Sequence, residues 1–196
     1  GGQSPSEGVY TNPELAYNLS ASLYSEYGAD FICMQEFNSW PRTKAGLADR
    51  LLALGYKEVP YSKAGNTPIF YNPEKFQLLK YGTVIYESYL PDSDLTALTP
   101  GSDQYNKEKY NDNVRYNGVS KMAVWGIFKD KTSGKIFALA STHLDHQDTA
   151  YANKRRALQS QELLKAINEK ILVGEYANIP MIFGGDINTS YNRENN

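Results

Sequence analysis

Ala-Ser-Thr-His-Leu-Asp-His, at residues 140–146, ends an apolar run that begins at Ile136. A short, continuously apolar run is typical of a strand that is covered on both faces. Both histidines of the chain, His143 and His146, lie at the end of this run. Because alternate residues of a strand share a face, we expect Asp145 to lie beside His143 and to orient it. Taken alone, His143 is also compatible with a purely structural role.

Two other apolar runs end in polar residues in the same way. Residues 31–34 are followed by Gln35 and Glu36, and residues 180–183 lead through two glycines to Asp186 and Asn188. Sheets of α/β proteins tend to carry their sites at the carboxyl ends of strands, so we expect these polar groups to lie close together. The alternatives stay open: a solvated Glu36, and an Asp-Asn turn that caps its own backbone.

The remaining pattern mixes helices and strands in one domain that spans residues 1–196. Helices are predicted where apolar residues recur at helical spacing, and strands where short apolar runs lie between turn residues. A proline at the first helical position and glycines at the ends support two of the helices. The predicted helices begin near Pro13, Thr43 and Thr149, and the predicted strands cover 31–34, 67–71, 77–86, 121–128, 136–144 and 180–183. Hairpins alternate with helical connections, which favours a layered α/β sandwich with mixed, largely antiparallel sheets.

The last predicted helix should bury its apolar residues. These are Ala157, Leu164, Ile167 and Ile171, which lie near one face.

Residues 87–120 interrupt the pattern with proline, aspartate, asparagine, tyrosine and lysine. An irregular segment of this length in a compact domain is often a lid or a binding loop. We therefore keep two predictions, a substrate-facing loop and a mobile surface excursion. Four tyrosines in the segment offer aromatic faces that could stack on a base or cover an apolar group.

Composition limits the possible partners. The 196 residues carry a formal charge of −2, without the basic surplus that a protein binding nucleic acid mainly through its phosphates would show. Cys33 is the single cysteine, so an intramolecular disulfide and a thiolate metal cluster are both excluded. No stretch is apolar and long enough for a transmembrane segment. The Gly-Gly start suggests a processed chain, and the abundant tyrosine and asparagine suit a secreted protein.

Three motifs, in this order, resemble those of the endonuclease/exonuclease/phosphatase superfamily, which includes pancreatic deoxyribonuclease and the neutral sphingomyelinases. They are Gln-Glu at 35–36, Thr-His-Leu at 142–144 and Gly-Asp-Ile-Asn at 185–188, where many members have phenylalanine in place of the isoleucine. Weaker similarities cover 68–71, 121–125 (where many members carry an arginine) and 156–159.

The resemblance implies a metal-dependent hydrolase of phosphate esters, with a role for each matching residue. Glu36 would bind Mg²⁺, or Mn²⁺, while His143 would contact the scissile phosphate. Asp186 would position and activate the attacking water, and Asn188 would hold the phosphate or that water. Lys121 would bind the substrate, a phosphomonoester or phosphodiester of a small molecule, a phospholipid head group or nucleic acid.

The resemblance also implies parts that these 196 residues lack. Family members begin with a strand that ends in an asparagine near the metal, and they carry an Asp-His pair near the C-terminus. We therefore expect a domain that is incomplete at both ends, without its first strand and its C-terminal strands. An alternative function follows from this expectation: a truncated phosphoesterase fold that binds a ligand without turnover.

Overall fold

The computed structural model describes residues 13–37, 46–61, 66–86, 89–116 and 121–189. Within these ranges no helix is long and apolar enough to span a bilayer. The elements run in the order α1 (Pro13–Glu26), β1 (Phe31–Cys33), α2 (Leu47–Ala53), β2 (Lys57–Glu58), β3 (Ile69–Tyr71), β4 (Phe76–Ile85), η2 (Asp92–Asp94), α3 (Asp103–Tyr116), β5 (Met122–Asp130), β6 (Ile136–His143), α4 (Ala150–Ala166), η3 (Ile167–Ile171), η4 (Gly174–Tyr176) and β7 (Met181–Asp186).

The chain forms two sheets. Strands β1, β3 and β2 make a three-stranded antiparallel sheet, and the second sheet has the order β4-β5-β6-β7. In the second sheet β4, β5 and β6 are antiparallel, whereas β6 and β7 run parallel. The parallel pair requires a crossover, which α4 supplies. The predicted mixed, largely antiparallel α/β sandwich is therefore confirmed.

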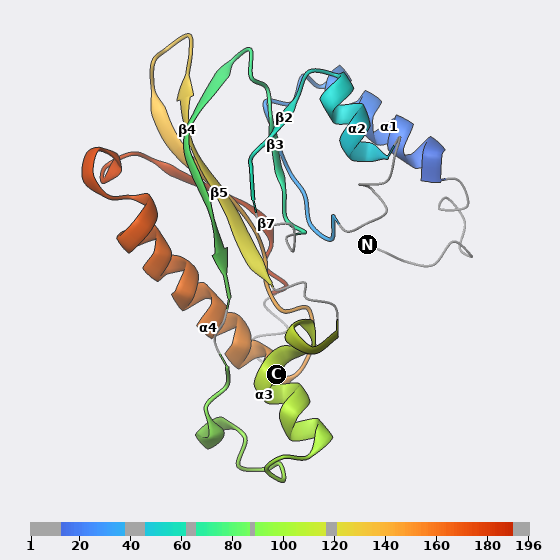
Figure 1. Cartoon of the computed structure of the whole chain (residues 1–196), viewed down its shortest axis with the longest axis vertical. Helices are drawn as coiled ribbons and strands as arrows, with labels where there is room; N and C mark the ends of the chain where they lie inside the picture. Colours follow the sequence, from blue (N-terminus) through green and yellow to red (C-terminus); the bar gives the residue numbers. More distant parts are fainter. Residues whose placement is uncertain (1–12, 38–45, 62–65, 87–88, 117–120, 190–196) are drawn as a thin grey trace.

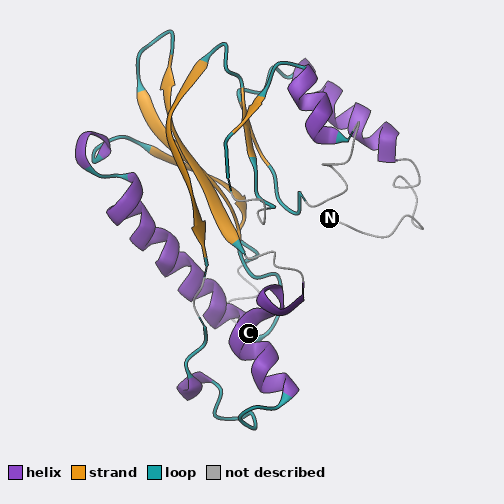
Figure 2. Cartoon of the chain, viewed as in Figure 1, coloured by secondary structure: helices purple, strands orange, loops and turns teal. Residues whose placement is uncertain are grey.

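The two sheets pack face to face between two layers of helices (Figures 1 and 2). One face of β5 packs with α4, through Ala123, Trp125 and Ile127. The other face of β5 packs against β3 of the first sheet. The outer face of the first sheet is covered by α1 and α2. Because β5 is covered on both sides, its first seven residues are all buried, as a continuous apolar run predicts.

A cluster of phenylalanine rings joins the two sheets. Phe31 of β1 lies with its ring centroid 4.5 Å from that of Phe76 and 4.8 Å from that of Phe128. Phe137 completes the cluster, 5.6 Å from Phe31. Phe31 begins β1 and Phe137 lies near the start of β6, so the cluster fixes the sheets at the end opposite to the carboxyl ends of these strands.

Helix α1 begins at Pro13 and ends before Gly28, whose φ of 58° is easily reached only by glycine. Gly55, with a φ of 92°, follows α2 in the same way. Both helix ends agree with the prediction from the sequence. The predicted start of α2 at Thr43 lies outside the described residues.

Segment 87–120 differs from the predicted irregular loop. Among its described residues, 89–116, η2 and the 14-residue α3 form. Leu90, Leu95 and Tyr105 make a small core of their own, packed against Tyr151 and Leu158 of α4. The prediction failed because polar residues dominate α3, so helical spacing of apolar residues was absent.

The buried face of α4 was also predicted wrongly. Ala157 and Leu164 are exposed, although Ile167 and Ile171 beyond the helix are buried as expected. The buried face carries Ala152, Arg155, Arg156, Gln159, Leu163 and Ala166. Periodicity of apolar residues therefore selected the wrong side, because this helix buries two arginines and a glutamine against the turn after β6.

Strand β7 is less covered than the predicted buried strand. Ile182 and Phe183 are 51% and 52% exposed. Within the described part of the chain, β7 is the last strand of the second sheet and pairs with β6 alone.

Candidate functional site

The carboxyl end of β1 lies against β6. Gln35 Nε2 donates to Ser141 Oγ at 3.3 Å, and Ser141 Oγ donates to the carbonyl of Met34 at 3.4 Å. The backbone of β7 lies equally close to β1, because a Cβ on Gly184 would lie 2.7 Å from Cys33 Sγ. A side chain at position 184 would push the two sheets apart, so this glycine permits their close approach. Glu36 therefore emerges beside the ends of β6 and β7.

His143 and Asp186 end the parallel pair β6 and β7 and are partners in its register. Two further bonds tie the residues that follow. The backbone N–H of Leu144 donates to the carbonyl of Asp186 at 3.0 Å, and Asn188 Nδ2 donates to the carbonyl of Leu144 at 3.1 Å. The β6-β7 pair thus brings together His143, Asp186 and Asn188, and the packing of β1 against it adds Glu36, which is close enough to act on the pKa of His143.

Two of these residues have unusual backbones. Among the described residues, Glu36 (φ 54°) and Asn188 (φ 52°) are the non-glycine residues with positive φ. Asparagine tolerates this left-handed conformation, but for glutamate it costs about 1–2 kcal/mol. Strain of this kind persists where the surrounding structure enforces it, and it clusters at functional sites. The backbone of Glu36 therefore marks this strand end as a candidate functional position.

The imidazole of His143 is 2% exposed, and its Nδ1 has no hydrogen-bond partner. Burial lowers the pKa of His143 to about 4, and the positive charge of Lys121 acts in the same direction. Asp186 and Glu36 oppose the shift without overcoming it. His143 is therefore neutral at pH 7, with a buried ring nitrogen that still needs a partner.

Lys121, the residue that precedes β5, is 7% exposed. Burial lowers its pKa to about 8, against the opposing negative charges of Asp145, Glu36 and Asp186. Lys121 therefore keeps most of its positive charge at neutral pH. A cation held inside the protein at the ends of these strands is a suitable contact for a phosphate group.

Asp145 does not orient His143 as expected. Its Oδ2 accepts from Arg155 Nε at 2.6 Å, and its Oδ1 accepts from the backbone N–H of Gln147 at 2.9 Å. The strand ends at His143, so the alternation that would place both side chains on one face no longer applies.

The Asp186–Asn188 turn shows the alternative considered from the sequence. Asp186 Oδ1 accepts from the backbone N–H of Asn188 at 2.9 Å, which closes an Asx turn. Asn188 contributes its amide nitrogen to the turn after β6 and so has a structural role. Asp186 remains exposed, with a second carboxylate oxygen at the strand end.

No group of three or more His, Cys, Asp or Glu side chains in the described ranges could hold a metal ion by itself. Glu36 and Asp186 offer two exposed carboxylates at neighbouring strand ends. Mg²⁺ is usually bound by one or two carboxylates, with water and substrate phosphate completing its shell. The donor set therefore fits an open Mg²⁺ or Mn²⁺ site and does not fit a closed structural metal site.

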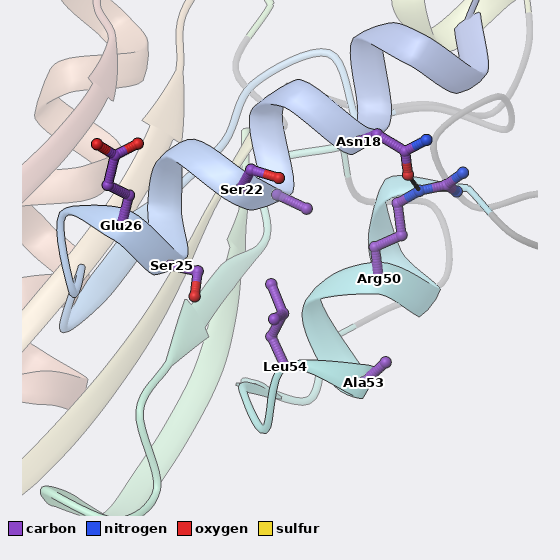
Figure 3. Close-up of a pocket in the computed structure, with 8 residues that line it drawn as sticks. Asn18, Ser22, Ser25, Glu26, Arg50, Ala53 and Leu54 are labelled. Atoms are coloured by element: carbon purple, nitrogen blue, oxygen red, sulfur yellow. Dashed lines mark hydrogen bonds between the residues drawn. The ribbon is translucent and has the colours of Figure 1, made fainter.

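A separate groove of about 540 Å³ lies between α1 and α2 (Figure 3). Ser22, Ser25 and Leu54 line it, and Arg50 Nε donates to Asn18 Oδ1 at 2.6 Å. None of its lining residues belongs to β1, β6, β7 or α4. The groove therefore shares no residue with the strand-end site.

Solved structures share this arrangement of sheets and helices. The catalytic domain of human Nocturnin, with bound sulfate, is 22% identical and has a TM-score of 0.62 over 90% of this chain and 58% of its own. An endonuclease/exonuclease/phosphatase from Bacteroides vulgatus is 21% identical, with a TM-score of 0.64 over 96% of this chain and 62% of its own. The chain has the endonuclease/exonuclease/phosphatase fold. The predicted resemblance is thus confirmed at the level of the fold.

A mannosyl-6-phosphatase from Bacteroides thetaiotaomicron has the same fold, at 22% identity and a TM-score of 0.60 over 90% of this chain and 57% of its own. This chain therefore spans about three fifths of the length of these neighbours. No protein-family model matches the chain, and no curated protein matches it significantly in sequence.

Two contacts of the site were not predicted. Tyr86 OH lies 2.6 Å from Thr142 Oγ1, buried next to His143. Arg155 binds Asp145 from α4. The weak similarity at residues 156–159 marked the right helix, but no pattern in the sequence indicated that an arginine there would be buried.

The strain at Glu36 predicts a gain in stability on substitution. Replacing Glu36 by glycine should raise the free energy of unfolding by about 1 kcal/mol, because glycine adopts a positive φ without steric cost. Urea unfolding of the variant measures the difference. Gln35→Gly is the matched control and should lower stability; an equal loss at both positions would show that Glu36 is not strained.

The lowered pKa of His143 predicts an acid-sensitive stability. The unfolded chain takes up this proton near pH 6.5 and the folded chain only near pH 4, so the contribution is complete above pH 6.5 and is lost toward pH 4. Between pH 7 and pH 5 the wild-type chain should lose about 2 kcal/mol more than His143→Gln.

Urea unfolding at both pH values tests this difference. The exposed His146→Gln is the control and should retain the wild-type loss. The same loss in all three proteins would contradict the assignment to His143.

Proposed function

We propose that this chain carries the active site of a metal-dependent hydrolase of phosphate esters. The observation that supports it most directly is the strained Glu36, which, like the exposed Asp186, is close enough to the buried Lys121 and His143 to act on their pKa values. Strained backbones and shifted pKa values of this kind cluster at functional sites. The phosphatase among the structures of the same fold agrees with this class of reaction.

Two buried side chains would receive the phosphate group. Lys121, charged at neutral pH, would offset the negative charge of the phosphoryl oxygens. Before substrate binds, His143 would be a neutral imidazole, because burial lowers its pKa to about 4. A neutral ring still donates one N–H, and its unpartnered Nδ1 would gain a partner when substrate binds.

Asp186 would act on water. Its exposed carboxylate, in register with His143, has an oxygen that can accept a proton from a water molecule or orient that molecule for attack. The turn closed by Asn188 would fix the direction of this carboxylate. We therefore assign Asn188 to positioning, with direct contact to phosphate as a secondary role.

Glu36 would be the protein ligand of a divalent cation, Mg²⁺ or Mn²⁺. When bound, the cation would polarise the phosphoryl oxygen and offset charge on the leaving group. Glu36 and Asp186 are both close enough to Lys121 and His143 to act on their pKa values, so a cation at Glu36 would lie near the groups that receive the phosphate.

The substrate is proposed to be a small phosphate ester, such as a sugar phosphate or a lipid head group. The formal charge of −2 offers little for extended nucleic acid, although a short nucleotide ester fits the same chemistry. This preference matches the mannosyl-6-phosphatase activity of one protein with the same fold.

Asp186→Asn should cost far more activity than Glu36→Gln. Glu36 supplies one of several oxygen ligands to the cation, so excess Mg²⁺ should restore much of the activity of Glu36→Gln. An amide at position 186 cannot take up a proton, so Asp186→Asn should lower kcat by about 100-fold or more, without rescue. The measurement is a Mg²⁺ titration of aryl phosphate hydrolysis by the full-length gene product.

Two outcomes would contradict these roles. Full recovery of Asp186→Asn at high Mg²⁺ would move Asp186 from the water to the metal. Absence of chelator-sensitive hydrolysis in the wild-type protein, with retained binding of phosphate, would favour the alternative of a ligand-binding module without turnover.

A further inference from the structure

Arg155 is the centre of a buried ionic network beside the candidate site. Its side chain is 2% exposed, and its partners Asp145 and Glu108 are 1% and 4% exposed. Nε donates to Asp145 Oδ2 at 2.6 Å, and Nη1 donates to Glu108 Oε2 at 2.8 Å. Nη2 donates to Gln147 Oε1 at 3.2 Å. One guanidinium thus binds α4, the turn after β6 and α3 together.

The turn after β6 depends on this network. Asp145 lies two residues after His143, and its backbone N–H donates to Gln159 Oε1 at 2.9 Å. Arg156 donates to the carbonyls of Asp145 and Gln147 at 3.2 Å and 2.9 Å. The turn is therefore held by side chains of α4, and Arg155 neutralises the one carboxylate in it that is fully buried.

The same guanidinium fixes α3. Besides the carboxylate of Glu108, Arg155 Nη1 binds the backbone carbonyl of Glu108 at 2.8 Å. Figure 1 shows α3 beside the N-terminal end of α4. The segment that carries α3 also leaves and rejoins the sheet at the site, since the backbone N–H of Tyr86 donates to the carbonyl of Lys121 at 3.0 Å.

We propose that Arg155 is a positioning residue that locks segment 89–116 to the turn after β6, so that this segment selects which phosphate esters reach the site. The inference rests on the proposed function. It assigns the substrate preference to α3 and its connections. It also assigns the buried Glu108 a role, which is to attach α3 to Arg155.

Arg155 compensates the charge of Asp145 and holds α3 in place. Without Arg155, the buried Asp145 would have an uncompensated negative charge close enough to Lys121 to act on it, where it would oppose a phosphate group. With glutamine at position 108, Asp145 would stay paired with Arg155, but the charged bond between Arg155 and α3 would become a weaker neutral one, and only the bond to the backbone carbonyl would keep its strength. The two changes should therefore have different kinetic consequences.

Glu108→Gln is the decisive variant. It should raise KM at least fivefold for the best bulky ester in a panel of a sugar 6-phosphate, a glycerophospholipid head-group ester and a dinucleotide. Hydrolysis of 4-nitrophenyl phosphate should change less than twofold, because the turn and Asp145 are untouched. Arg155→Met should lower kcat on both kinds of ester by tenfold or more. Arg155→Lys should retain part of the wild-type kcat, because lysine keeps the positive charge.

Lys154→Gln is the matched control. Lys154 also joins α4 to the same segment, through Asp94 at 2.6 Å, but the pair is partly exposed and does not contact the turn. Lys154→Gln should leave kcat and KM unchanged for both the small and the bulky ester. If Arg155→Met does not fold, the triple variant Arg155→Met, Asp145→Asn, Glu108→Gln removes the unpaired buried charges. It should fold, but it should not recover the wild-type preference for the bulky ester over 4-nitrophenyl phosphate.

Amide hydrogen exchange gives a readout that is independent of activity. In Arg155→Met the amide of Gln147, which donates to Asp145, and the amides of α3 should exchange faster together, while those of β5 stay protected. In Glu108→Gln only the amides of α3 should exchange faster. If neither the wild-type protein nor any variant shows chelator-sensitive hydrolysis, but the coupled exchange is observed, the proposed function is refuted. The structural link that Arg155 makes between α3 and the turn is then still supported. Equal changes on small and bulky esters, or uncoupled exchange, would overturn the inference about Arg155.

Discussion

The close approach of β1 to β7 is the contact on which the site depends. Gly184 has room for no side chain opposite Cys33, and the bonds of Gln35 and Ser141 fix the same approach next to it. The phenylalanine cluster holds the sheets at the other end. Packing that serves stability at one end thus brings three polar strand ends together at the other, where few apolar contacts remain to stabilise them.

The site keeps groups that folding alone would remove. A glutamate with positive φ, a buried histidine nitrogen without a partner and a lysine with a lowered pKa all cost stability. They lie close enough together that Lys121 lowers the pKa of His143, whereas Glu36 acts to raise the pKa of both. Destabilising features of this kind, surrounded by well-packed strands, are typical of functional sites.

The sequence predicted the fold well wherever apolar residues decided it. Buried strands such as β5 and β6 were found because their residues are apolar on both faces. The prediction failed where polar residues are buried, as for Arg155 in α4 and Glu108 in α3, since periodicity of apolar residues does not reveal an ion pair formed across 47 positions of the chain. The meeting of Glu36, His143 and Asp186 was predicted from strand ends, but their chemical roles stay predictions.

The most direct test of the account is to observe the two histidines while phosphate binds. The chain has two histidines, so a nitrogen-15 spectrum of the imidazole rings resolves His143 and His146 individually. Inorganic phosphate added with Mg²⁺ should shift the His143 resonances and leave those of the exposed His146 nearly unchanged, and Lys121→Met should weaken the response. Phosphate that binds to the protein without altering His143 would contradict the claim that these strand ends form one phosphate site.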